Sequence, residues 1–285
     1  MSKKEITVVS VIYKNLNWVV WNIKLIAKLN TDFNINFVFI DNDRILKHFR
    51  NQFILKLLEL LLVRVEIKLS RNTKENLKLD GSLQHASGLD LAAKMILTEF
   101  VVVLDPDCVV IIPNWMTKFF ELINDNAYDL VGTPEAQSEL NSFRKQNFLN
   151  YKFHSPLPFL IFGKQNIVFR YSFKPNVESN FELDTGYLLS QSFLRGELKG
   201  FLFSAKSTRN SKCEIESINK FSCTFYEKSN PKNETWCVHF GRGSNRFGKN
   251  RKNQNFGKRI IYAFMDPCQF RKAINKYIKS NFSSK

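Results

Sequence analysis

The sequence predicts an α/β protein with a mostly parallel β-sheet that helices flank on both faces. Short, continuously apolar segments rich in β-branched residues recur in the first half of the chain, as expected of strands buried on both sides. Segments with helical spacing of apolar residues alternate with them, which indicates parallel strands joined by crossover helices. Residues 135–180 are polar, aromatic and interrupted by prolines, and they predict a mixture of strands and loops.

The individual elements follow in regular order. In the first half, strands are expected at ITVVSVIY (6–13), FVFID (37–41), VRVEIKL (63–69), FVVVL (100–104) and YDLVGTP (128–134). Helices are expected on the segment with Trp18 and Trp21, over about 45–62, within 81–99 after a turn, and over 116–124. In the second half, IVFRYSF (167–173) is a strand candidate and FELDTGYLLSQSFL (181–194) enters a helix. TWCVHFGRGSNRF (235–247) is a strand leading into a glycine-rich basic loop, and about 258–280 has helical spacing.

The chain is strongly basic, and the excess charge is concentrated near its end. Lys and Arg total 42 against 26 Asp and Glu, which gives a net charge of +16. Residues 240–285 hold twelve Lys or Arg and one acid, so they carry +11 and the first 239 residues carry the remaining +5. Such a segment either attracts phosphate-bearing partners (nucleic acid, anionic lipid or a nucleotide) or keeps the surface solvated.

Cysteine spacing and hydropathy indicate the cellular compartment in which the protein is expected. The five cysteines are widely spaced, with no C-x-x-C pair, which favours free thiols in a reducing cytosol over a zinc site. The N-terminus leads straight into a strand, and no stretch reaches the roughly 18 uncharged apolar residues of a membrane-spanning helix. We therefore expect a cytoplasmic protein. Peripheral contact with an anionic membrane stays open, because ILKLLELLLV (54–63) is apolar apart from Lys56 and Glu59.

Three carboxylates are expected to meet at one edge of the sheet. Asp41 ends the second strand, and Asp105 and Asp107 follow the fourth. Ligands of open α/β sheets bind outside the carboxyl ends of the strands, and buried carboxylates are costly unless they are paired or bound to a metal. An Asp-x-Asp motif offers oxygen ligands that suit Mg²⁺ or Mn²⁺, which can stabilise a diphosphate leaving group. The alternative is a strand-end turn with solvated acids.

Three segments resemble a family 2 glycosyltransferase with the GT-A nucleotide-sugar-binding fold: ITVVSVIYKN (6–15), FVFIDND (37–43) and TEFVVVLDPDCVVIIPNW (98–115). The resemblance covers residues 5–135 well and the rest loosely. It implies a single GT-A catalytic domain over 1–250, in which 5–135 bind the nucleotide sugar and 136–250 form the acceptor half. Residues 251–285 would form a basic helical tail.

The resemblance also implies roles for the residues at the sheet edge. Val11 and Tyr13 would line the base pocket, and Asp41 would contact the base or the ribose. Asp105 and Asp107 would hold a Mn²⁺ or Mg²⁺ cofactor and the donor diphosphate.

The second half is expected to supply a general base, because inverting transfer needs a group that takes the proton from the acceptor hydroxyl. In the family this base is an acid in the second half of the domain. Asp184 and Glu182, in FELDTGYLLS, are the candidates. Asp184 directly precedes Thr185 and Gly186 at the opening of a helix, so it is equally a candidate N-cap.

A late histidine is the remaining candidate. His239 ends an apolar segment and precedes the glycine-rich, basic sequence GRGSNR, in which Arg242 and Arg246 are suited to a phosphate group. Related enzymes often carry a late histidine at the metal or the diphosphate, and a neutral imidazole suits either ligand. The alternative is a buried structural histidine. His85 and His154 lack such a setting and are expected to be structural or acceptor-side.

The leading hypothesis is a metal-dependent, inverting glycosyltransferase of the hexosyltransferase type. It would move a sugar from a nucleoside-diphosphate sugar to a hydroxyl of a glycan or lipid-linked acceptor. One alternative is a nucleic-acid-binding protein that stacks bases on Phe256, Tyr262 and Phe264. Without a metal, however, the carboxylates would repel a phosphate backbone, so we expect no nucleic-acid partner. A nucleotidyltransferase of similar architecture would show a glycine-rich motif after the first strand, where this chain has YKNLNW (13–18).

Overall fold

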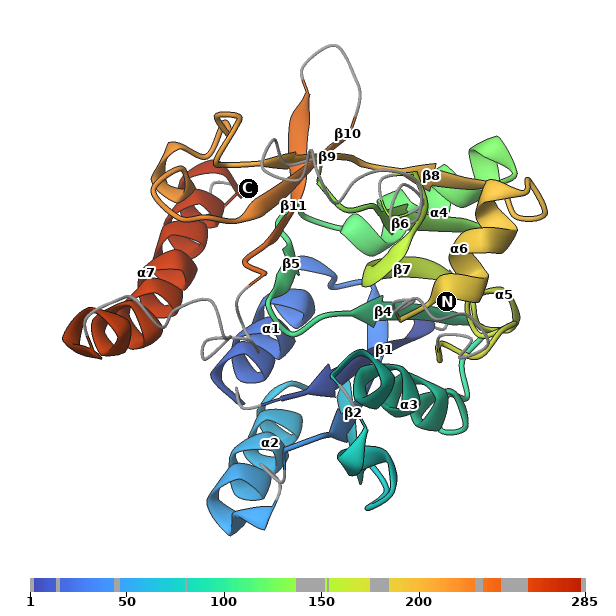
Figure 1. Ribbon diagram of the computed structural model, residues 1–285, viewed down its shortest axis with the longest axis horizontal. Helices are drawn as coiled ribbons and strands as arrows, with labels where there is room; N and C mark the ends of the chain where they lie inside the picture. The colour runs from blue at the N-terminus through green and yellow to red at the C-terminus, as the bar shows by residue number, and fades with distance from the viewer. Residues whose placement is uncertain are drawn as a thin grey trace.

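Two β-sheets of unequal size organise the computed structural model (Figure 1). The structure describes residues 3–13, 16–43, 47–79, 81–136, 152, 154–174, 185–228, 233–241 and 256–282, with side chains in the last range from Pro267 onward.

The larger sheet has seven strands in the order β3-β2-β1-β4-β7-β6-β8. Strands β1, β2, β3 and β4 are parallel, as the alternating pattern predicts, and β7 runs antiparallel between β4 and β6. The bounds are β1 Lys4–Ile12, β2 Phe33–Asp41, β3 Val65–Arg71, β4 Phe100–Leu104, β6 Leu130–Thr133, β7 Leu157–Lys164 and β8 Gly200–Leu202. The expected α/β architecture with a mostly parallel sheet is confirmed.

Alternate side chains of the strands enter two separate hydrophobic cores. Ile6 and Val8 of β1 belong to the core that includes residues of α1, α2, α4, α7 and the smaller sheet, whereas Val9 and Val11 pack with α3 and α6 on the other face. This period of two follows from the pleat of a strand. The helices are α1 Leu16–Leu29, α2 Phe49–Leu61, α3 Gly81–Ala93, α4 Trp115–Asn126, α5 Gln165–Val168, α6 Tyr187–Leu194 and α7 Phe256–Phe282, with short 3₁₀ turns at Asn76–Lys78 and Glu216–Ile218.

The smaller sheet is antiparallel, with the order β5-β11-β10-β9. It joins the segment directly after β4 to the last strand of the chain, because β5 (Cys108–Val110) pairs with β11 (Glu234–His239). The other two strands are β9 Ser204–Ser207 and β10 Thr224–Lys228. The sequence predicted only β11 of these four strands.

The prediction of a strand at 167–173 is wrong. Residues 165–168 form the helical turn α5, and the strand lies earlier, at 157–164, where Pro156 and Pro158 disfavour a strand assignment. The register between β6 and β7 shifts at this point, since Gly132 pairs with Ile161 and Thr133 with Leu157. Pro158 therefore falls in a bulge of the β6–β7 ladder, where it disrupts no regular pair.

Two sequence expectations concern thiols and membranes. All five cysteines are free thiols, as their spacing predicted. In the part of the chain that the structure describes, none of the helices combines the length and the apolar character needed to cross a bilayer.

Candidate active site

The loop between β4 and β5 (residues 105–107, the β4–β5 loop) is hydrogen-bonded from several elements. The backbone N–H of Asp105 donates to the carbonyl of Phe159 in β7 at 3.0 Å, and the N–H of Cys108 donates to the Asp105 carbonyl at 3.0 Å. From α1, the side-chain amide of Asn22 donates to the carbonyls of Pro106 at 2.7 Å and Cys108 at 3.1 Å. These contacts fix the backbone that carries the Asp-x-Asp carboxylates.

Strand pairing brings His239 to this loop. His239 is the last residue of β11 and lies opposite Cys108, the first residue of β5. The N–H of Phe240 donates to the Asp107 carbonyl at 3.0 Å, which extends the ladder by one step. The imidazole also packs on Phe159, with ring centroids 4.5 Å apart. A histidine remote in sequence is therefore held beside Asp107 by main-chain geometry.

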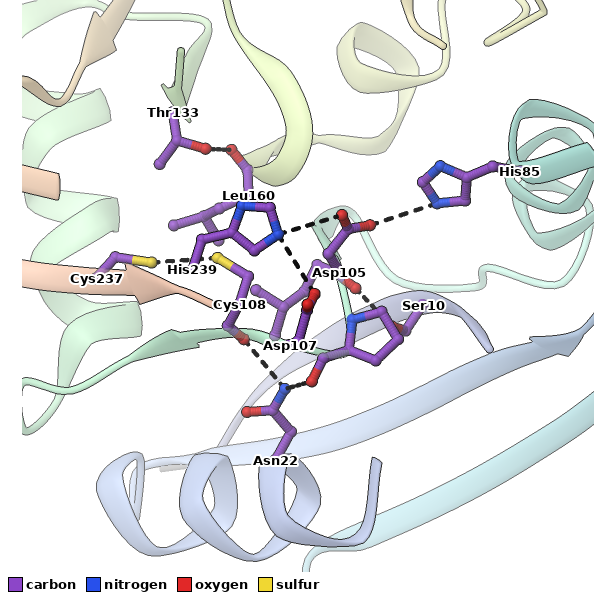
Figure 2. A network of polar contacts seen from close by, with 12 residues as sticks. Ser10, Asn22, His85, Asp105, Asp107, Cys108, Thr133, Leu160, Cys237 and His239 are labelled. Carbon is purple, nitrogen blue, oxygen red and sulfur yellow. Dashed lines mark hydrogen bonds and ion pairs between the residues drawn. The ribbon is translucent and has the colours of Figure 1, made fainter. Parts of the chain in front are cut away.

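The side chains of Asp105, Asp107 and His239 converge. His239 Nε2 lies 3.3 Å from Asp107 Oδ1 and 3.8 Å from Asp105 Oδ2, and one potential ligand atom from each residue fits within 4.8 Å of the others. Figure 2 shows the imidazole directed toward both carboxylates. Asp107 and His239 are buried, and Asp105 is partly exposed, so the group opens to solvent on the Asp105 side.

The environment of His239 favours a positive charge at this position. Burial lowers the pKa of the imidazole, but the negative charge of Asp107, its hydrogen bond and the charge of Asp105 outweigh burial and raise that pKa above its ordinary value. A protonated ring cannot bind a cation, so a proton and a metal compete for this nitrogen.

The donor set fits a divalent cation. Two carboxylates and one imidazole, supplied by the β4–β5 loop and β11, suit Mn²⁺ and also Mg²⁺, which keeps additional water or phosphate ligands. The two carboxylates provide the negative charge that a buried cation requires. They form the candidate metal site.

The remaining predicted residues of the first half lie at the same sheet edge. Asp41 is the last residue of β2, is buried, and accepts a hydrogen bond from the N–H of Asp43 at 3.0 Å. Tyr13 directly follows β1 and is half-buried. Val11 is buried against α3, where a Cβ at Gly88 would lie only 2.9 Å from Val11 Cγ2. A glycine at position 88 therefore permits the close approach of α3 to β1.

Four predicted site residues, Glu182, Asp184, Arg242 and Arg246, lie outside the described residues. The residue after Asp184 is placed: Thr185 is buried and its hydroxyl donates to the carbonyl of Ser82, in the first turn of α3, at 2.9 Å.

The N-cap position of α6 belongs to Gly186, which has a φ of 81° and makes no side-chain cap. The alternative role of Asp184 as an N-cap stays a prediction, because Asp184 lies outside the described residues.

Two residues of the site were not predicted from the sequence. His85 of α3 directs Nε2 to Asp105 Oδ1 at 3.5 Å, opposite His239, although no role near the carboxylates was expected for it (Figure 2). Asn22 is the second. Each is a polar residue one turn from a buried apolar one, since His85 precedes Leu89 and Asn22 precedes Ile26 by four positions. That spacing suggests that both residues face inward, but it does not tell that either contacts the β4–β5 loop.

No protein-family model and no curated protein sequence matches this chain. Among solved structures, a mannosyltransferase from Pyrobaculum calidifontis, PcManGT in complex with GDP-Man and Mn²⁺, matches with a TM-score of 0.50 at 12% sequence identity. The match covers 72% of this chain and 56% of the mannosyltransferase chain, so this chain spans little more than half of that protein. The match shows that the fold is the GT-A fold, as the resemblance implied.

Two further structures are similar at lower scores. TarS 1–349 from S. aureus in complex with UDP-GlcNAc has a TM-score of 0.45 at 15% identity, covering 70% of this chain and 56% of that chain. Glucosyl-3-phosphoglycerate synthase from Mycobacterium tuberculosis, in complex with phosphoglyceric acid, has a TM-score of 0.45 at 11% identity, covering 70% and 69%.

Proposed function

We propose that the chain is a metal-dependent glycosyltransferase that uses a nucleoside-diphosphate sugar as donor. The observation that carries this proposal is the Asp105–Asp107–His239 group at the carboxyl end of β4, because a GT-A fold offers this edge to a ligand. The mannosyltransferase of the same fold was solved with GDP-Man and Mn²⁺, which supports a donor and a cation of this kind here.

In this proposal each residue at the edge has a distinct task. Asp105, Asp107 and His239 would hold the cation, which when bound neutralises the charge that develops on the departing diphosphate. Asp41 would accept a hydrogen bond from the base or the ribose, and Val11 and Tyr13 would line the base pocket. Arg242 and Arg246 would contribute positive charge to the diphosphate.

We further propose an inverting transfer to a hydroxyl of a glycan or lipid-linked acceptor. A carboxylate, Asp184 or Glu182, would take the acceptor proton as the oxygen attacks the anomeric carbon and the bond to the diphosphate breaks. The contact of Thr185 with Ser82 supports Asp184, because Ser82 lies one helical turn before His85, which itself contacts Asp105. A single hexose would be the group transferred.

The test is a calorimetric titration of UDP, GDP and dTDP, with and without Mn²⁺. The wild type is compared with Asp105→Ala/Asp107→Ala and with the control Glu121→Ala/Asp125→Ala, which removes two exposed carboxylates on α4. We expect one nucleoside diphosphate to bind in a metal-dependent manner to the wild type and the control but not to the site variant. Retention of RNA or DNA with no nucleotide binding would contradict the proposal and favour a nucleic-acid-binding protein.

A further inference from the structure

Helix α2 has two apolar faces, and only one of them is buried. Leu55 and Leu58 pack into the core beneath the large sheet. On the other side of the helix, five side chains recur at spacings of three and four and form a second stripe. We call this stripe the outer face of α2; it consists of Phe49, Phe53, Leu57, Leu60 and Leu61.

The outer face concentrates the exposed apolar surface of the molecule. Among the described residues, nine large hydrophobic side chains are exposed, and six of them lie between positions 49 and 63. Phe49 is 80% exposed, Leu60 71% and Val63, directly beyond the helix, 95%. Single exposed apolar residues are ordinary, but a contiguous stripe along one helix marks a surface that binds something.

The charge around this stripe is positive. Residues 47–79 hold eight Lys or Arg and three Glu, a net charge of +5, and Arg50 and Lys56 are exposed on α2 itself. The one acid of the helix is Glu59. It accepts a hydrogen bond from the N–H of Ile67 in β3 at 3.0 Å and another from Lys56, one turn earlier on α2, at 2.5 Å. An approaching surface therefore meets apolar side chains and cations.

We propose that the outer face of α2 binds the surface of an anionic phospholipid membrane. Aromatic and leucine side chains on one stripe with basic residues beside it are the requirements for a helix that lies in the plane of a bilayer interface. The positive segment would gain from anionic headgroups. A second copy of the chain is disfavoured, because a two-fold contact through this face would bring together the exposed cations Lys47, Arg50 and Lys56 of both copies.

The position of α2 relates this surface to the sheet edge. The crossover from Asp41 leads to Phe49, so the helix begins at the end of the sheet that carries Asp41 and runs back toward the start of β3. Figure 1 shows α2 at one extremity of the molecule, remote from the smaller sheet. A bilayer against the outer face would therefore adjoin the edge where a ligand is expected.

The test is sedimentation of the full chain with vesicles of phosphatidylcholine alone or mixed with phosphatidylglycerol. We expect binding to the mixed vesicles only, and a decrease of at least about tenfold in Leu60→Gln/Leu61→Gln, because two leucines no longer enter the bilayer. The control Leu97→Gln/Leu194→Gln changes two exposed leucines elsewhere and should bind as the wild type does. Lys47→Gln/Arg50→Gln should bind several-fold more weakly.

Two outcomes would overturn the proposal. One is equal binding of the wild type and Leu60→Gln/Leu61→Gln to the mixed vesicles. The other is no vesicle binding together with a wild-type dimer that this variant dissociates, as measured by analytical ultracentrifugation, which would assign the outer face to a second copy. The experiment needs neither metal nor sugar donor, so its failure leaves the proposed function untouched.

Discussion

The β4–β5 loop and the outer face of α2 depart from the usual distribution of side chains in opposite ways. Near the loop, Asp107 and His239 are buried although they carry or can carry charge. On α2, Phe49 and Leu60 are exposed although they are apolar. The buried groups have partners inside the chain, whereas no described residue covers the apolar stripe. The loop is thus built before any ligand arrives, whereas the stripe would be covered, in our proposal, by a membrane surface.

The largest expected effect is a difference in the free energy of unfolding between substitutions on the inner and the outer face of α2. Leu55→Ala, on the inner face, should lower the free energy of unfolding by about 2–5 kcal/mol, because it leaves a cavity in the core. Leu60→Gln, on the outer face, should change it by no more than about 0.5 kcal/mol. Urea denaturation measures both. Equal destabilisation by the two substitutions would show that the outer face is covered within the folded chain.

A smaller loss of stability is expected when the hydrogen bonds that hold the β4–β5 loop are removed. Asn22→Ala removes both hydrogen bonds to the carbonyls of residues 106 and 108, which should cost about 1–3 kcal/mol of stability. Because these bonds orient the Asp-x-Asp backbone, Mn²⁺ affinity should fall about 10–100-fold. Thermal unfolding and Mn²⁺ titration measure the two quantities.

Asn30→Ala is the matched control for Asn22→Ala. Asn30 is also buried, but its side-chain amide donates to the carbonyl of Ile26 and accepts from the N–H of Met116, and neither of these partners belongs to the β4–β5 loop. Its loss should reduce stability to a similar degree and leave Mn²⁺ affinity unchanged. A parallel loss of affinity in both variants would mean that general destabilisation, not loop geometry, controls the metal site.

The smallest effect is a pH dependence at His239. The folded chain raises the pKa of this imidazole, so the pairing with Asp107 contributes stability below the unfolded pKa of about 6.5, and this contribution is lost as pH rises through the folded pKa. Without metal, His239→Gln should therefore be destabilised relative to the wild type mainly at low pH. With Mn²⁺, stabilisation of the wild type should grow as pH rises. Thermal melts across this range, with and without Mn²⁺, test both trends.

Local patterns in the sequence were sufficient for the parallel strands β1, β2, β3 and β4. The apolar strands and the acids that end them predict Asp41, Asp105 and Asp107 at one sheet edge, because parallel strands end together. The assignment failed at β7, where Pro158 lies in a bulge that only the partner strand explains.

The juxtaposition of Asp107 and His239 was harder to predict. It depends on pairing between β5 and β11, a contact between segments remote in sequence that leaves no local periodicity. The resemblance suggested a late histidine at the metal, but the strand pairing that brings His239 to Asp107 is seen only in the smaller sheet. His85 was missed because helical spacing alone does not tell which polar residue faces a neighbouring loop.

The β5–β11 pairing also has a consequence for the life of the protein in the cell. Asp107 and His239 are 132 positions apart, so a cation bound to both would act as a removable cross-link that closes a long segment of chain. Any ligand that binds only the folded state shifts the folding equilibrium by mass action. If the proposed site binds a cation, the free metal concentration would set both the fraction of the chain that survives proteolysis and the rate of the proposed sugar transfer.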